Sequence, residues 1–175
     1  MTSRRTLRVT AALMVLGVAS LAFTGTAIAQ KKKKFDKKAA KEEITAIYET
    51  YIQPGGLFET RIEVIEDNEN PEVIANLEAA LAASGGVATG KTLNIKFVNR
   101  KLAQVDVGIF LDPEALDAEP IITHEDQYVV FSGGSWVMSL DGYCYLGEQG
   151  GTPCSEPLLD RAAELLAKAK KAKKI

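Results

Sequence analysis

The chain has 175 residues, of which 46% are apolar, 25% charged and 7% aromatic, and its formal net charge is −2. This is the composition of a globular domain, and it excludes a disordered or fibrous chain. One His and two Cys exclude a zinc cluster of the zinc-finger type, and the length is too short for two full domains and a linker.

The first 29 residues have the pattern of a secretory signal peptide. Three arginines precede the apolar run Val9–Phe23, and the small residues Ala27 and Ala29 follow it. The run is shorter than the ~20 residues that span a bilayer, which disfavours the alternative of a membrane anchor. We expect cleavage between Ala29 and Gln30 and a secreted or envelope-associated protein. Export by the general secretory route is expected, and a pair of adjacent arginines leaves the twin-arginine route as the alternative.

Basic residues are concentrated at the two ends of the expected mature chain. Residues 30–41, which we expect to form a flexible arm, hold seven Lys and one Asp, and further lysines lie between Lys168 and Lys174. Residues 42–160 hold five basic and twenty-one acidic side chains. The ends either bind an anionic envelope component, through Lys31–Lys41 and the C-terminal lysines, or only aid solubility. Because the acidic body repels phosphates, we expect no nucleic-acid binding.

Three helices are expected first. Apolar residues at helical spacing cover residues 36–51, and a second helical stretch covers residues 57–67. Pro71 suits the first turn of a third helix, which we expect to end at residues 84–86.

After residue 92 the apolar period changes from 3.6 to 2, which predicts antiparallel strands with one buried face. The first two strands are expected at Leu93–Val98 and Ala103–Leu111, followed by an acidic loop. Two more, Ile121–Ser132 and Ser135–Leu146, flank a Gly-Gly pair that favours a two-residue hairpin turn.

That turn also predicts the pairing of its strands. In this register Phe131 faces Trp136 on the buried side, whereas Val130 and Val137 fall on the opposite, more polar face. A slip by one residue would turn the apolar set outward, so the register is well specified.

A last, amphipathic helix is expected from Glu156 to the Lys-rich C-terminus. Helices followed by antiparallel strands predict the α+β class, with the N-terminal helices on one face of a curved antiparallel sheet of about four strands. The expected organisation is a signal peptide (1–29), a basic arm (30–41), an α+β domain (42–155) and the C-terminal helix (156–175).

Cys144 and Cys154 are expected to form a disulfide, because paired cysteines are usually bridged in an oxidising compartment. The glycine-rich segment between them folds back easily. The bond would connect the last strand to the start of the last helix. Free or intermolecular thiols are the alternative.

Three further motifs resemble binding or catalytic sites, but ordinary structural roles explain them better. Gly85–Thr92 matches the phosphate-binding loop pattern, but a helix enters it and a strand leaves it, the reverse of what that loop needs. Asp67, Glu69 and Glu78 match part of a calcium loop, but a proline falls where a ligand is needed. His124 stands in an expected strand beside two acids, and no nucleophile can be placed next to it, which favours a surface side chain over a catalytic base. We expect no metal or cofactor site.

The segment Val129–Ser139 resembles the V-x-F-x-x-G-G-W-x-x-S ending of the mycobacterial low-molecular-weight secreted antigens and their actinobacterial relatives. Ser135 is an insertion in that pattern, and the resemblance covers roughly residues 40–146. It implies an exported single domain without assigned catalysis. The helix-then-sheet order is similar to the cone-shaped α+β fold of ketosteroid isomerase and nuclear transport factor.

Enzymes on such a cone place ionisable side chains on the concave face of the sheet. The strand positions that we expect to face the helices are all apolar: Leu93, Ile95, Phe97, Val105, Val107, Ile109, Val129, Phe131, Trp136 and Met138. The side chains expected to line any pocket are Tyr48, Tyr51, Phe97, Val107, Phe131, Trp136 and Met138.

We identify no catalytic residue and expect an exported, non-enzymatic domain that binds a partner protein or an apolar small molecule. The alternatives are a small isomerase- or hydratase-like enzyme using Tyr48 or His124, and a structural envelope protein.

Overall fold

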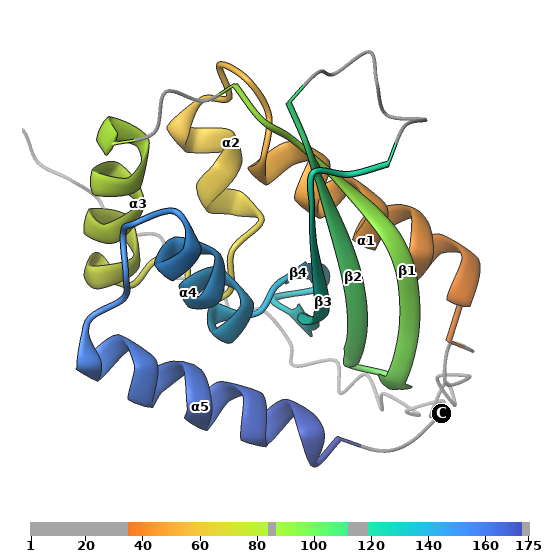
Figure 1. The fold of residues 1–175 in the computed structure, drawn as a ribbon. Coiled ribbons are helices and arrows are strands. Elements are labelled where there is room, and N and C mark those ends of the chain that lie inside the picture. The colour runs from red at the N-terminus through yellow and green to blue at the C-terminus, as the bar shows by residue number, and fades with distance from the viewer. Residues whose placement is uncertain (1–34, 84–86, 112–118, 173–175) are drawn as a thin grey trace, which may run out of the picture. The chain divides into compact units, whose positions relative to one another are not determined.

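The structure is a computed structural model, which describes residues 35–83, 87–111 and 119–172. The expected signal peptide, its cleavage site, the first lysines of the basic arm and most of the acidic loop lie outside these ranges, as does the expected end of the third helix. In the described ranges, three helices precede a four-stranded antiparallel sheet and two helices follow it (Figure 1). This arrangement confirms the expected α+β class.

The first helix begins where the apolar spacing predicted it and includes the last residues of the expected basic arm. The helices are α1 (Lys37–Tyr51), α2 (Phe58–Glu63), α3 (Pro71–Ala83), α4 (Leu140–Gln149) and α5 (Glu156–Lys170). The Asp36 carboxylate accepts hydrogen bonds from the backbone N–H groups of Lys38 and Ala39 and so caps α1. Because this cap starts the helix at Lys37, the expectation of a flexible arm is wrong for residues 37–41.

The sheet curls into a half-barrel (Figure 1). Its strands, each antiparallel to the next, are β1 (Thr89–Asn99), β2 (Leu102–Phe110), β3 (Ile122–Ser132) and β4 (Ser135–Met138). The β3–β4 hairpin has the expected register, with Phe131 opposite Trp136. Gly133 and Gly134 in its turn have φ angles of 62° and 103°. Positive φ at both central positions is what a tight primed turn requires, and glycine adopts it without strain.

The fourth strand is shorter than expected, because the chain turns into a helix after Met138. The Ser139 hydroxyl accepts a hydrogen bond from the Gly142 N–H at 3.0 Å and caps α4. The apolar residues that follow therefore form the buried side of a helix rather than the inward face of a strand. The expected strand Ser135–Leu146 is wrong beyond Met138.

Residues 64–66, expected to belong to the second helix, instead run parallel to β4. The Met138 N–H donates to the Val64 carbonyl at 2.8 Å, and the Met138 carbonyl accepts from the Glu66 N–H at 2.9 Å. Because α2 ends at Glu63, these residues are extended enough to pair with the strand. The pairing covers the outer edge of β4 and buries Ile65 in the core.

The main core lies between α1 and the concave face of the sheet. Ile44 and Tyr48 of α1 and Val105 and Val107 of β2 are at most 1% exposed. The helices before the sheet thus cover one of its faces, as expected.

The opposite face of the sheet is also covered at one end. Leu102, Val130 and Val137 pack there against Leu166 of α5. The expectation of a more polar face at Val130 and Val137 is wrong, because α5 folds back along the sheet and excludes water from these side chains.

Two of the apolar positions expected to face the helices are exposed. Leu93 lies at a shift in register between β1 and β2, which turns its side chain over Gly108 on the other face and leaves it 45% exposed. Phe131 lies in β3 at the hairpin turn and is 36% exposed, although its ring centroid is 5.8 Å from that of Trp136.

The expected disulfide between Cys144 and Cys154 is present. It connects α4 to the segment before α5, and not the last strand to the last helix, because residue 144 is helical. Closing a loop of this length stabilises the fold by about 2–3 kcal/mol, mainly by restricting the unfolded chain.

Candidate functional site

A pocket of about 340 Å³ lies at the end of the half-barrel away from the β3–β4 hairpin, and we call it the open-end pocket. Its walls come from α1, α2, α3, β2, β3 and α4 with the residues that follow α4. Its large apolar side chains are Ile52, Leu77, Leu81, Ile109, Ile122 and Leu146. Among its polar side chains are Tyr51, Arg61 and His124. An apolar lining with a few polar groups is typical of small-molecule sites.

His124 reaches this pocket because β3 contains a bulge. Val105 is opposite Gln127, but the next inward residue of β2, Val107, is opposite His124, so one extra residue of β3 lies between the two pairs. Asp126, inside the bulge, has a φ angle of 56°. The extra residue reverses the alternation of the strand, so His124 points to the concave face and is 8% exposed. The expectation of a surface histidine is wrong for this reason.

Asp106 of β2 holds the bulge in place. One of its carboxylate oxygens accepts the Asp126 N–H at 3.2 Å, and the other accepts the Asn94 side-chain amide at 3.1 Å. Three neighbouring strands are therefore connected through one carboxylate on the outer face. Its contacts favour the conformation that directs His124 inward.

The surroundings of His124 keep its ring neutral. Burial lowers the pKa of His124 below its usual value, because the charged form loses its hydration. Its ring lies 5.4 Å from that of Tyr145, centroid to centroid, at an interplanar angle of 84°. A neutral imidazole in this position offers one donor and one acceptor to the pocket.

Arg61 and Tyr51 supply further charged and hydrogen-bonding groups to the open-end pocket. The Arg61 Nη2 donates to the Gln53 carbonyl at 2.6 Å, while Nε is buried and has no hydrogen-bond partner among the described residues. A Cβ at Gly56 would lie 2.8 Å from this Nε, so glycine there leaves room for the guanidinium. Burial raises the pKa of Tyr51 to about 12, although the positive charge of Arg61 opposes the shift. The Tyr51 hydroxyl is therefore protonated at neutral pH.

The side chains expected to line a pocket do not all meet in one place. Tyr51 lines the open-end pocket. Phe97, Phe131 and Trp136 form an aromatic cluster at the hairpin end of the sheet. The others, Tyr48, Val107 and Met138, are fully buried in the core. The Tyr48 hydroxyl has no hydrogen-bond partner within the described ranges, and burial raises its pKa above the usual value.

Arg61 was not among the side chains predicted from the sequence to line a pocket, although one signal was present. Arg61 is the only basic residue between Lys41 and Lys91, in a segment rich in acids. The position of His124 had no comparable signal, because a bulge is not visible in a pattern of alternating residues.

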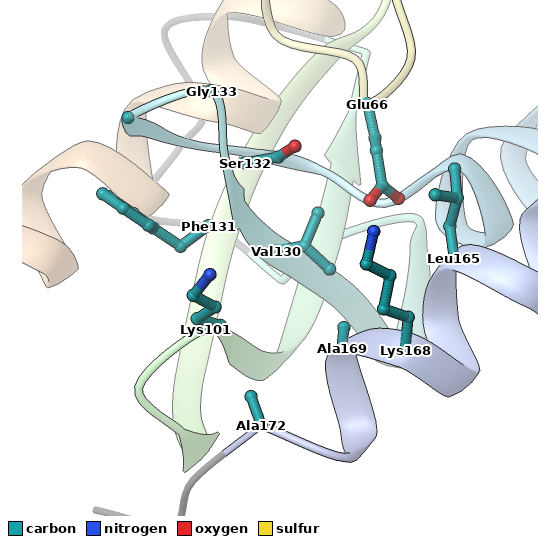
Figure 2. Close-up of a pocket in the computed structure, with 11 residues that line it drawn as sticks. Glu66, Lys101, Val130, Phe131, Ser132, Gly133, Leu165, Lys168, Ala169 and Ala172 are labelled. Carbon is teal, nitrogen blue, oxygen red and sulfur yellow. The ribbon is translucent and has the colours of Figure 1, made fainter.

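A second hollow of about 530 Å³, the α5 groove, lies between α5 and the β3–β4 hairpin (Figure 2). Glu66 and Lys168 point toward one another across it. Glu66 is 8% exposed, and its Oε2 accepts the Leu140 N–H at 3.1 Å. Burial raises the pKa of Glu66, because the charged carboxylate loses its hydration. The hydrogen bond from Leu140 acts in the opposite direction, since it stabilises the charged form. We assign Glu66 a structural role, because it fixes the start of α4.

The phosphate-loop and calcium-loop motifs are accounted for by packing. Gly90 lies in β1, where a Cβ would be 2.8 Å from the Ile52 Cβ, so glycine permits the close approach of the chain after α1. Asp67 forms an ion pair with Arg161 at 3.1 Å, and hydrogen bonding to this arginine lowers the Asp67 pKa. Among the described residues, no group of three or more His, Cys, Asp or Glu side chains is placed to hold a metal ion.

Comparison of the chain with models of known families, with curated proteins and with solved structures found no match. In residues 35–83, 87–111 and 119–172, every helix is too short or too polar to cross a bilayer.

Proposed function

We propose that the chain is an exported, non-enzymatic domain that binds a small apolar molecule in the open-end pocket. The observation that carries this proposal is the pocket itself, a hollow of about 340 Å³ with large apolar side chains on its walls and a few polar groups, Tyr51, Arg61 and His124 among them. Its size lies at the lower end of the range for ligand sites, roughly 300–1,000 Å³. A ligand there would remove apolar surface from water at little cost in conformational change.

Export is supported by two independent features. The first 29 residues have the signal-peptide pattern, and the protein contains a disulfide, a bond that persists in oxidising compartments. The resemblance to the secreted antigen family points the same way. The basic residues at the two ends would then contact an anionic component of the envelope.

The proposal is tested by blocking the pocket. Binding of decanol, decanoate and decylamine to the oxidised protein is measured by calorimetry and by amide chemical shifts. Ala80 lines the pocket, whereas Ala82 on the same helix is exposed and does not. We expect at least one probe to bind, and Ala80→Phe to weaken it by at least about tenfold, while Ala82→Phe leaves it unchanged. No binding by any probe, or equal effects of the two variants, would contradict the proposal.

The position of His124 favours one alternative, a small enzyme of the isomerase or hydratase type. His124 and Tyr51 line the same pocket, whereas the other candidate, Tyr48, is sealed in the core. We favour binding because the described lining residues of this pocket include no carboxylate to act with the imidazole as a second acid–base group.

A further inference from the structure

We infer that the ligand of the open-end pocket carries a carboxylate, and that Arg61 is the side chain that binds it. The inference rests on the proposed function and specifies the chemical class of the ligand. It follows from the charge of the pocket and from the unused donors of Arg61.

The described lining residues of the pocket carry one fixed positive charge. Arginine keeps its proton at any physiological pH, Tyr51 is neutral because its pKa is raised to about 12, and His124 is kept neutral by burial. The described lining residues include no Asp or Glu. A guanidinium among apolar side chains is unfavourable unless an anion pairs with it, so the site selects a negatively charged ligand.

The guanidinium also has unused hydrogen-bonding capacity. It has five N–H donors in a planar fork, and the hydrogen bond to the Gln53 carbonyl uses one of them. Its Nε is buried without a partner in the described part of the chain. Carboxylates match this fork, because their two oxygens accept parallel N–H bonds. The Tyr51 hydroxyl, which shares the pocket and interacts with the charge of Arg61, is a further donor for the same anion.

The charge of the described lining residues favours a monoanion such as a carboxylate over a doubly charged, cationic or neutral head group. A single cation balances a monoanion, whereas a doubly charged phosphate would leave a negative charge in an apolar site. An amine would be repelled by Arg61. An alcohol would be bound through its chain alone, since it cannot pair with the charge. We therefore assign the pocket to a monocarboxylate with an aliphatic or similarly apolar body.

Three probes with the same chain length test this assignment at neutral pH: decanoate, decanol and decylamine. With the full, oxidised protein we expect decanoate to bind at least about tenfold more tightly than decanol, and decylamine most weakly. Arg61→Gln should remove the preference for decanoate and leave the affinity for decanol within about twofold. Arg100→Gln, in the exposed turn between β1 and β2, is the matched control and should change neither.

The outcomes separate the inference from the proposed function. Equal affinities for decanoate and decanol in the native protein would overturn the carboxylate assignment and leave the binding function standing. A preference for decanoate that survives Arg61→Gln in a folded variant would overturn the role of Arg61. Absence of binding by all three probes would overturn both. Should Arg61→Gln fail to fold, Arg61→Lys replaces it: it keeps the charge but loses the planar fork, and we expect a weakened preference for decanoate.

Discussion

The two ends of the half-barrel are filled in different ways. At the hairpin end, Trp136 is 5% exposed and its ring centroid lies within 6.5 Å of those of Phe35, Phe97 and Phe131. At the open end, an arginine, a tyrosine and a histidine border a pocket instead. One curled sheet is thus closed by aromatic packing at one end and left hollow at the other. Close packing stabilises the fold at the first end, and the second end is where we propose that a ligand binds.

The largest expected effect tests the packed end. Trp136→Ala should lower the free energy of unfolding by roughly 3–5 kcal/mol, because it removes a buried indole from an aromatic cluster. At the open end, Leu81→Ala changes a half-buried side chain and should cost only about 1 kcal/mol. Urea unfolding followed by circular dichroism measures both. A larger loss of stability in Leu81→Ala than in Trp136→Ala would contradict the view that the hairpin end stabilises the fold more than the open end.

The disulfide contributes to both stability and the pocket, so its removal should have an intermediate effect. The Cys144→Ser, Cys154→Ser double variant should lose about 2–3 kcal/mol of stability. Several residues between the two cysteines, such as Leu146 and Thr152, line the open-end pocket, so affinity for decanoate should fall as well. A reductant should mimic the variant in the native protein and have no effect on the variant itself. Unchanged ligand affinity would show that the pocket wall does not depend on the bond.

The smallest effect concerns the bulge that directs His124 inward. Asp106→Ala removes the acceptor of the Asp126 N–H and should cost about 1 kcal/mol. If the bulge relaxes and His124 moves toward water, its pKa should rise toward the usual value. Loss of a nearby negative charge alone would lower this pKa, so the direction separates the two effects. NMR titration reads it directly, because the chain has one His.

The same pKa has a consequence for stability. The folded-state pKa of His124 lies below that of the unfolded chain, so the unfolded chain takes up its proton first as the pH falls. Stability should therefore decrease as the pH drops through about 6.5, the unfolded value, and less so in Asp106→Ala. The same measurement on His124→Gln gives the pH dependence of stability without the imidazole. The difference between the two pH profiles is the contribution of His124.

The sequence predicted the hairpin end better than the open end. The pairing of Phe131 with Trp136 followed from the Gly-Gly turn and the alternation of apolar residues. At the open end the disulfide followed from the two cysteines, but the pocket beside it did not. The end of β4 did not follow, because a side-chain cap at Ser139 outweighs a periodic pattern that suits either a strand or a helix. His124 was misplaced because one extra residue in β3 reverses the direction of the side chains between that residue and the start of the strand.

The pairing of residues 64–66 with β4 has a consequence for any protein partner. Both backbone groups of Met138 are used in this pairing, since its N–H donates to Val64 and its carbonyl accepts from Glu66. An extended peptide therefore cannot lengthen the sheet at this margin without first displacing a segment of the domain itself. A protein that docks here must recognise the shape and chemistry of side chains instead.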